Sequence, residues 1–563
     1  MQADRSTEST LSTVARSLCD RHPGPQGLGA ERPRAAKDVL LYDTTLRDGA
    51  QTEGVSLSVE DRVKITRHLD ELGIDYIEGG WPCRENPTDV AFFRRMEQTP
   101  PAHAKLVAFG STRRLKAKVE QDPQVHALLR AETSVVTIFG KSWDLHVVGA
   151  LGATLQQNLD MIGDTVAYLK AQGREVIFDA EHFFDGYKGN PDYALATLQA
   201  GQTAGADCIA LCDTNGGTLP HELEPIIRAA QAAVSSPLGI HAHNDSDVAV
   251  ANTLLAVRLG AAQVQGTING YGERCGNANL CSVIPSLHLK LGKRCLPPEK
   301  LARLYEVAHY VAEVANLPPA ERQPYVGRSA FAHKAGVHVD AVLKRPETYE
   351  HVAPELVGNQ RRLLVSDQAG TSTVVYKARA LEIDLTKQSP QTRAILQRVK
   401  EMEHEGYQFE GAEASFELLM RKTMGTYRNL FDLGGFRVIV EKRAEGDILS
   451  EATIKVRVNG VEEHTAAEGD GPVNALDVAL RKALEKFYPE LREIKLTDFK
   501  VRVIAGSEGT AAKVRVLVES CDPTDSWSTV GVHANIIEAS WQALVDAIEY
   551  GLMRRRAAGE NKD

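Results

Sequence analysis

The chain has 563 residues, of which 43% are hydrophobic and 25% are charged. This length exceeds what one hydrophobic core organises, so we expect two or more domains of ordinary globular composition. The formal net charge of −10 and the lack of a dense basic stripe argue against a nucleic-acid partner.

The cysteines and the apolar segments indicate the compartment. The eight cysteines are scattered and form no CxxC pair, which is typical of proteins in a reducing cytosol. No apolar stretch approaches the length that crosses a bilayer, and no secretory signal opens the chain. The sequence therefore predicts a cytoplasmic protein that has no membrane partner.

Residues 1–37 contain many Ser, Arg, Gly and Pro residues and show no sustained apolar periodicity. This composition predicts a disordered N-terminal extension. A transit peptide is the alternative, but such peptides are poor in acidic residues, and this segment contains four, Asp4, Glu8, Asp20 and Glu31.

Residues 38–300 repeat one unit, a short apolar β-rich run followed by an amphipathic helical stretch. Eight strands alternating with helices over roughly 250 residues predict an α/β fold, the (β/α)₈ TIM barrel, with catalytic groups at the carboxyl ends of the strands. The eight predicted strands are VLLYDTTL, YIEGGW, KLVAFGS, SVVTIFG, EVIFDAEH, CIALCDT, LGIHAHN and QVQGTING.

Beyond the barrel the pattern changes twice. Residues 301–420 are mostly helical, interrupted by GRSAFAHKAGVHVDAV and SDQAGTST, and predict a helical connector. Residues 421–556 contain strands and then a helix, twice over, which predicts an α+β domain with an internal repeat. Such a repeat is typical of a ligand-sensing or dimerising module. Residues 557–563 are predicted to be a tail.

Two histidines spaced one residue apart, His241 and His243, close the seventh predicted strand. Side chains at i and i+2 of a strand point to the same side, so both imidazoles can bind one metal ion. Asp48 follows the first strand, which only the eighth separates from the seventh in a closed barrel. One carboxylate and two imidazoles leave positions on a divalent ion for a chelating substrate. The alternative is that both histidines are neutral core or capping residues.

A glycine-rich segment, GYGERCGNAN, follows the eighth predicted strand and contains Asn277. Its glycines allow a tight turn, and the Asn277 amide is placed at the same rim. The segment resembles a dinucleotide-binding GxGxxG only superficially, because the third glycine comes one residue late and the ribose-binding acid is missing. We therefore expect no nucleotide cofactor.

Arg47 precedes the predicted ligand Asp48, so its guanidinium is placed to stabilise a developing enolate or alkoxide. The alternative is a salt bridge at the strand end with Glu78 or Glu181. Glu181, in DAEHFFDG, is a candidate proton-transfer group, or else a structural partner of Arg47.

Six motifs, LYDTTLRDGAQ, DAEHFFDGY, CDTNGG, HAHND, NGYGERCGN and AGVHVDAV, together resemble the acyl-CoA-dependent condensing enzymes that include isopropylmalate, homocitrate and citramalate synthases. The resemblance covers about residues 38–556. It implies a divalent ion, Mg, Mn or Zn, bound by Asp48, His241 and His243, with Asn277 as a further or outer ligand. It also implies that pyruvate chelates this ion and that Thr214 holds its carboxylate. Arg47 would stabilise charge on the reacting oxygens, and Glu181 would assist proton transfer.

The same resemblance assigns roles beyond the barrel. His338 and Asp340, in the connector, would complete the site of the partner subunit in a homodimer, with His338 as the candidate base. EGGWPCRENPTDVAFF and KSWDLHV resemble the citramalate synthase branch most closely. This branch condenses acetyl-CoA with pyruvate to give (R)-citramalate and CoA, the first step of a threonine-independent route to isoleucine. The C-terminal repeat would then be a regulatory domain that binds isoleucine at a dimer interface.

One segment departs from that branch. In WPCRENP, Cys83, Arg84 and Glu85 add bulk and charge near the expected pocket, where relatives carry a smaller sequence. A few side chains suffice to change the keto acid, so 2-isopropylmalate synthase, which uses 2-oxoisovalerate, is the main alternative. Two less favoured interpretations are a lyase of the same barrel type and a catalytically silent amino-acid sensor.

Overall fold

The computed structural model describes residues 37–560 apart from 367–368, 381–382, 428, 443, 445 and 505–510. The predicted N-terminal extension therefore lies outside the described residues, except for its last residue. The chain forms two compact units, residues 1–297 and 298–563. Among the described helices, none combines the length and the apolar character that a bilayer crossing needs.

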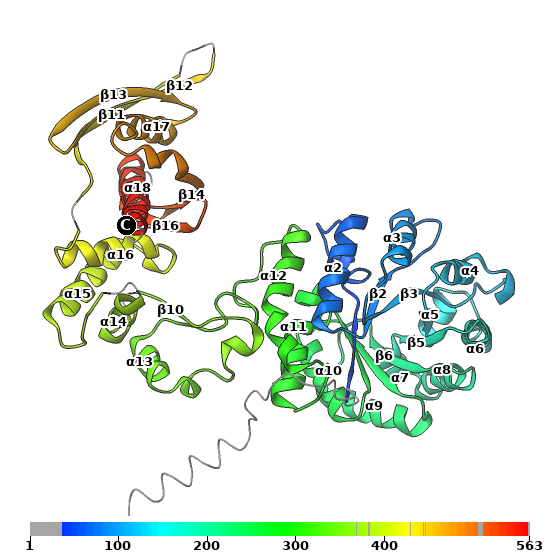
Figure 1. Ribbon diagram of the computed structural model, residues 1–563. Helices are drawn as coiled ribbons and strands as arrows, with labels where there is room; N and C mark the ends of the chain where they lie inside the picture. Colours follow the sequence, from blue (N-terminus) through cyan, green and yellow to red (C-terminus); the bar gives the residue numbers. More distant parts are fainter. Residues whose placement is uncertain are drawn as a thin grey trace, which may run out of the picture. The chain divides into compact units, whose positions relative to one another are not determined.

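The first unit contains a closed barrel of eight parallel strands (Figure 1). Strand β1 pairs with both β2 and β8, which closes the sheet. The predicted (β/α)₈ barrel is thus confirmed. The strands are β1 (Leu40–Asp43), β2 (Tyr76–Gly80), β3 (Lys105–Ser111), β4 (Val135–Lys141), β5 (Glu175–Glu181), β6 (Cys208–Asp213), β7 (Leu238–Ala242) and β8 (Gln263–Gly266).

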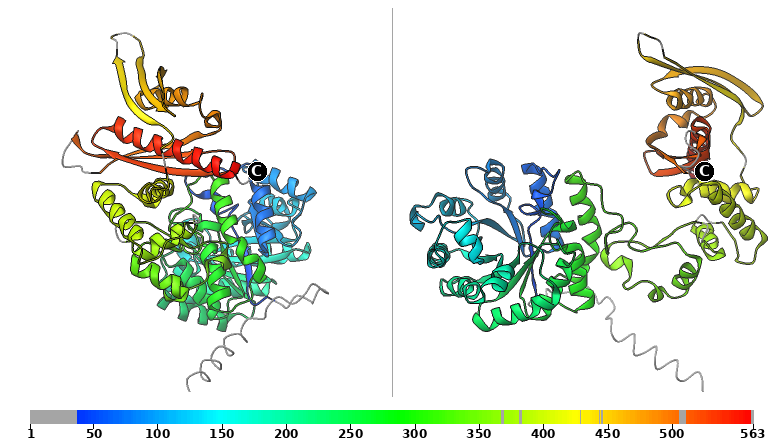
Figure 2. Two further views of the ribbon diagram at one scale, coloured as in Figure 1. Left: turned by 60° about the vertical axis from the view of Figure 1, so that its left-hand side comes forward. Right: turned by 180° about the vertical axis from the view of Figure 1, so that it is seen from behind.

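Helices surround these strands, as the view from behind also shows (Figure 2). Because the helices cover the outer face and side chains fill the interior, β2, β6, β7 and β8 are buried at every position. The helices are α2 (Val59–Leu72), α3 (Pro87–Gln98), α4 (Pro123–Arg130), α5 (Asp144–Gly149), α6 (Leu155–Ala171), α7 (Phe183–Gly189), α8 (Pro191–Thr203), α9 (Pro220–Ala233), α10 (Ala249–Arg258) and α11 (Leu280–Pro285), with the short η1 (Gly49–Gln51) after β1.

Local sequence sets where these helices begin and end. Helix α2 begins at a capping box formed by Ser58 and Asp61. It ends at Gly73, whose φ of 103° lies in the left-handed region that favours glycine. Thr154 and Gln157 form a second capping box at the start of α6. At one level of the barrel interior, the tyrosines of β1 and β2 meet apolar side chains of β3, β4, β5 and β6: Tyr42, Tyr76, Val107, Val135, Ile177 and Cys208.

The second unit begins with helices and two very short strands. The paired strands β9 (Ala332–His333) and β10 (Arg362–Leu363) run parallel. The helices are α12 (Leu304–Val314), α13 (Gly336–Lys344), α14 (Thr371–Ala380), α15 (Pro390–Glu405) and α16 (Glu413–Thr423). Helices α14, α15 and α16 share a hydrophobic core with Val530 and Val532 of the C-terminal repeat.

The predicted internal repeat is confirmed. Each copy is a three-stranded antiparallel sheet followed by a helix that packs on it. The first copy is β11 (Asp432–Lys442), β12 (Ile448–Val458), β13 (Val461–Gly469) and α17 (Pro472–Leu484), and the second is β14 (Lys495–Val503), β15 (Val514–Cys521), β16 (Ser526–His533) and α18 (Ile536–Glu560). Helix α18 therefore continues four residues into the predicted tail, and residues 561–563 lie outside the described residues.

Candidate metal centre and active-site cavity

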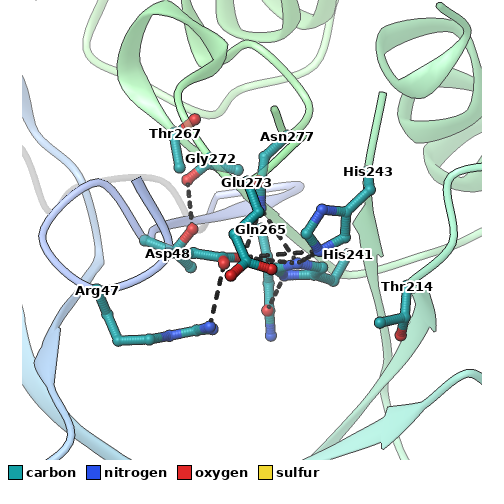
Figure 3. Close-up of polar contacts among 12 residues, drawn as sticks. Arg47, Asp48, Thr214, His241, His243, Gln265, Thr267, Gly272, Glu273 and Asn277 are labelled. Atoms are coloured by element: carbon teal, nitrogen blue, oxygen red, sulfur yellow. Dashed lines mark hydrogen bonds and ion pairs between the residues drawn. The ribbon is translucent and has the colours of Figure 1, made fainter. Parts of the chain in front are cut away.

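The three predicted metal ligands converge at the carboxyl ends of β1 and β7 (Figure 3). The Nε2 atoms of His241 and His243 are 3.3 Å apart. The Oδ2 atom of Asp48 lies 3.2 Å from Nε2 of His241 and 3.8 Å from Nε2 of His243. All three side chains are buried. Strand β7 carries His241, and His243 follows one residue beyond its end.

The turn that carries Asp48 is built by its own sequence, DTTLRD. The carboxylate of Asp43 accepts hydrogen bonds from the backbone N–H of Thr45 at 2.9 Å and from its hydroxyl at 2.8 Å. The Thr45 hydroxyl oxygen in turn accepts the N–H of Ile268, after β8, at 2.9 Å. Burial raises the pKa of Asp43 to about 7, although the hydrogen bonds from Thr45 by themselves lower it. The turn is closed by the backbone N–H of Asp48, which donates to the Thr44 carbonyl at 2.9 Å.

These donors fit a divalent metal ion. Ligand atoms about 2.1 Å from a common ion stand roughly 3.0 to 3.5 Å from one another, close to the separations found here. Burial and the neighbouring His241 lower the pKa of His243 to about 3, so its imidazole is neutral and keeps a lone pair. Burial raises the pKa of Asp48, but Arg47 and His241 outweigh it and hold this carboxyl well below its usual range. The set is thus one carboxylate with imidazole nitrogens beside it.

Asn277 contacts this triad from the glycine-rich loop. Its Nδ2 donates to Oδ2 of Asp48 at 2.7 Å and lies 3.2 Å from Nε2 of His241. Its buried Oδ1 has no hydrogen-bond partner among the described residues. A Cβ on Gly272 would stand 2.0 Å from that Oδ1, so only glycine permits this approach. Asn277 therefore donates to one predicted ligand, and its role as a further or outer ligand stays a prediction.

A cavity of about 250 Å³ opens beside the triad. It brings together six of the seven barrel residues predicted to act in catalysis, substrate binding or metal binding, all except Asn277: Asp48, His241, His243, Arg47, Glu181 and Thr214. The hydroxyl oxygen of Thr214 accepts the backbone N–H of His182 at 2.9 Å. The Thr214 hydroxyl proton is therefore available for donation to a bound group.

Arg47 is held by a carboxylate and an aromatic ring. Its Nε donates to Oε1 of Glu78 at 2.5 Å, and its Nη1 is 3.3 Å from Oδ1 of Asp48. Its guanidinium lies 3.8 Å from the ring centroid of Phe109. Of the two predicted salt-bridge partners, the structure selects Glu78, yet Arg47 still lines the cavity. Glu181 instead pairs with Lys141, which was not among the predicted site residues.

One wall of the cavity is aromatic, and this feature was not predicted. Trp81 directly follows β2, and Phe109 and Phe139 lie two residues before the ends of β3 and β4. The ring centroids of the three are 5.4 to 6.1 Å apart. An aromatic residue at the carboxyl end of three successive strands was the signal that could have revealed this wall.

Cys83, Arg84 and Glu85, which the sequence predicted near the pocket, do not form its wall. None of the three lines the cavity, and Arg84 and Glu85 are exposed. Strand β2 ends at Gly80, and the chain turns at once, with the N–H of Cys83 donating to the Trp81 carbonyl at 2.8 Å. This turn leaves Trp81 at the cavity.

His338 and Asp340 lie on α13, in the second unit, so the barrel cavity is formed without them. The His338 ring is exposed and stacks on Tyr349, with centroids 4.1 Å apart. Asp340 pairs with Lys344 and Lys387 and accepts the Ser372 hydroxyl at 2.8 Å. Hydrogen bonds from Lys344 and Lys387 hold the pKa of Asp340 far below its usual value.

Three family models match consecutive parts of the chain. Residues 38–311 match the family described as HMGL-like. Residues 325–407 match the family described as homocitrate synthase post-HMGL domain-like, and residues 410–552 match the LeuA allosteric (dimerisation) domain.

Full-length relatives match as well. An (R)-citramalate synthase from Geobacter sulfurreducens is 59% identical over 515 residues, which covers 91% of this chain and 97% of the relative. Another from Aquifex aeolicus is 57% identical and covers 93% of this chain and 99% of the relative. A probable 2-isopropylmalate synthase from Methanopyrus kandleri is 32% identical, with 92% and 99% covered. The chain is therefore much more similar to these two citramalate synthases than to this probable 2-isopropylmalate synthase.

Proposed function

This chain belongs to the (R)-citramalate synthase family, and we propose that it condenses acetyl-CoA with pyruvate and water to give (R)-citramalate and CoA. The observation that carries the proposal is one cavity in which the triad of Asp48, His241 and His243 meets Arg47 and Thr214. A 2-keto acid has a carboxylate and a keto oxygen on adjacent carbons, and these groups suit that set of residues.

The barrel residues bind and polarise the keto acid. When bound at the triad, a divalent ion, Mg, Mn or Zn, supplies Lewis-acid polarisation of the keto carbonyl. The Thr214 hydroxyl donates to the keto-acid carboxylate. The Arg47 guanidinium stabilises the negative charge that develops on the keto oxygen, and Phe109 beside it keeps water away from this charge.

Condensation needs a base for the methyl group of acetyl-CoA. We assign this step to His338 of the partner subunit, with Asp340 of the partner subunit beside it. The enolate carbon forms a bond to the keto carbon, and the resulting alkoxide takes a proton delivered through Glu181. Water then hydrolyses the thioester of citramalyl-CoA, which releases CoA and makes the overall reaction favourable.

A homodimer is part of this proposal. The matched C-terminal family is described as a dimerisation domain. Val337, the chain neighbour of His338, is 77% exposed, and Tyr349, which stacks on the His338 ring, is exposed as well. Apolar side chains gathered beside a candidate base suit docking on a second copy of the chain.

The proposal includes control by isoleucine, the end product of the route. In the C-terminal repeat, a cavity of about 780 Å³ lies beside α17 and β14 and is lined by charged residues, including Asp477 and Arg481, and by apolar ones, including Phe499 and Leu544. Such a lining suits a zwitterion with an aliphatic side chain. We also place the enzyme in the cytoplasm, which agrees with the free cysteines among the described residues.

The test is pyruvate-dependent release of the CoA thiol from acetyl-CoA, with the acid product identified. We expect release to stop after chelation and in His243→Ala, while His221→Ala, which changes an exposed histidine of α9, leaves it intact. Higher turnover with 2-oxoisovalerate would instead make the chain an isopropylmalate synthase. Calorimetry that detects amino-acid binding but no keto-acid binding would indicate a sensor.

A further inference from the structure

Behind the metal triad lies a chain of buried amide and carboxyl groups to which the proposed reaction assigns no role. Strand β8 pairs with β7 in a register that sets Gln265 beside His241. The Oε1 atom of Gln265 is 2.9 Å from Nδ1 of His241 (Figure 3). On its other side, Nε2 of Gln265 donates to Oδ1 of Asp179, on β5, at 3.0 Å. Gln265 and Asp179 are both buried in the barrel interior.

The direction of these hydrogen bonds follows from the groups involved. A carboxylate only accepts, whereas an amide has one accepting and one donating end. A second acceptor, Oε1 of Gln263, lies 3.3 Å from Nε2 of Gln265. Two acceptors around Nε2 turn the amide so that its oxygen faces His241. The amide oxygen accepts from Nδ1 of His241, so a proton lies on Nδ1, and in the metal-binding tautomer the lone pair is on Nε2, the atom that faces Asp48.

The other imidazole of the triad lacks this support. Nδ1 of His243 is buried and has no hydrogen-bond partner among the described residues. Of the two histidines, only His241 is therefore fixed in ring orientation and in tautomer by a neighbouring side chain. Support of this kind orders a ligand before the metal binds and raises its basicity.

We propose that Gln265, oriented by Asp179, is a positioning residue that holds His241 in the tautomer that binds the metal ion. Gln265 does not touch the ion or the substrate in this proposal, and it acts through His241 alone. The inference rests on the proposed metal centre, but it is independent of which keto acid is used.

The experiment measures Mn²⁺ affinity of the full-length protein by calorimetry, together with the Mn²⁺ concentration that gives half-maximal activity. Gln265→Met keeps the volume and removes the acceptor. We expect the Kd for Mn²⁺ to rise about 10-fold to 100-fold, the range found when such supporting groups are lost. We also expect kcat at saturating Mn²⁺ to stay within about threefold of wild type, since no catalytic group has changed.

Two further variants separate positioning from packing. Gln265→Glu restores an acceptor for Nδ1 of His241, and its protonated form still donates to Asp179, so it should recover most of the lost affinity. Asn252→Leu removes another buried amide of the barrel, which donates to the Thr218 carbonyl, and should bind Mn²⁺ like wild type.

An unchanged Kd in folded Gln265→Met would overturn the inference and leave the proposed function standing. If Gln265→Met does not fold, a comparison of Asp179→Leu with Asp179→Asn decides, because both remove the charge that Asp179 places at the cavity, but only Asp179→Leu removes the acceptor that orients the Gln265 amide. Asp179→Leu should bind Mn²⁺ several-fold more weakly than Asp179→Asn, and equal affinities would overturn the inference equally. A wild-type protein that binds neither Mn²⁺ nor Mg²⁺ would instead refute the metal centre itself.

Discussion

Glu78 fixes Arg47 at the cavity. Its buried carboxylate accepts the Arg47 Nε–H at 2.5 Å, and its second oxygen accepts the hydroxyl of Tyr42. Tyr42 is in turn 2.8 Å from the Thr137 hydroxyl, so the chain of hydrogen bonds extends into the barrel interior. In the pair of Glu78 and Arg47, the carboxylate balances the guanidinium charge. The Nη1 atom of Arg47 remains on the side of Asp48, 3.3 Å from its Oδ1.

Glu78→Gln should reduce kcat about 10-fold or more, because a charge-assisted hydrogen bond that orients Arg47 is replaced by a neutral one. The KM for pyruvate should change less, because Glu78 does not line the cavity. Glu175→Gln is the matched control, since that carboxylate also accepts a tyrosine hydroxyl, from Tyr76, but at the start of β5. Steady-state kinetics of both variants check the expectation, and equal kcat values would contradict it.

Mixed dimers test whether the connector works across subunits. His243→Ala removes a ligand in the barrel, and His338→Ala removes the candidate base, so each homodimer should be inactive. Random reassociation of equal amounts should restore about a quarter of wild-type activity, because half the dimers are mixed and each has one intact site. Activity that stays at the level of the separate variants would place His338 in its own subunit's site or outside catalysis.

The sequence predicted the triad because the relevant relationships are local. Alternation along one strand places His241 beside His243, and the order of strands in a closed barrel brings Asp48 to them. The partner of Arg47 was left open between Glu78 and Glu181, because strand assignment alone does not give the depth of a side chain in the barrel. The register of β4 and β5 sets Lys141 opposite Glu181, which accounts for that pair.

The aromatic wall illustrates a second limit. The segment WPCRENP predicted bulky side chains near the end of β2. The turn after Gly80 decides which of these side chains faces the cavity. That turn leaves Trp81 at the cavity, whereas the prediction concerned Cys83, Arg84 and Glu85.

Shortening the aromatic wall should change the choice of keto acid. We place the keto-acid methyl group against this wall, so Phe139→Ala should enlarge the space beside it and admit larger side chains. We expect the ratio of kcat/KM for 2-oxoisovalerate to that for pyruvate to rise about 10-fold or more, given 1 to 3 kcal/mol per methylene. Phe184→Ala, which shortens a buried aromatic residue of α7 that does not line the cavity, should leave the ratio unchanged. Competition between the two keto acids measures the ratio, and an unchanged ratio in Phe139→Ala would exclude the wall as the determinant.

Helix α16 is tied to α18 by an unbalanced ionic cluster in the second unit. Nζ of Lys422 lies 3.3 Å from Oδ1 of Asp546 and 3.3 Å from Oε2 of Glu549, so two carboxyls share one ammonium. Ser415 donates its hydroxyl to Asp546 at 2.8 Å. Burial raises the pKa of Asp546 and of Glu549, and Lys422 offsets this only in part.

This cluster predicts how stability depends on pH. Carboxyls with a raised pKa bind more protons in the folded than in the unfolded state. Their contribution to the free energy of unfolding therefore falls as the pH rises above their ordinary pKa of about 4. Asp546→Asn removes one of the two charges and keeps an acceptor for Ser415. At pH 8 it should raise the melting temperature of this unit, and this gain should shrink toward pH 5. Calorimetry across that range, with Asp470→Asn at an exposed position of the same unit as the control, checks the sign, and a variant that melts lower than wild type at pH 8 would refute the assignment.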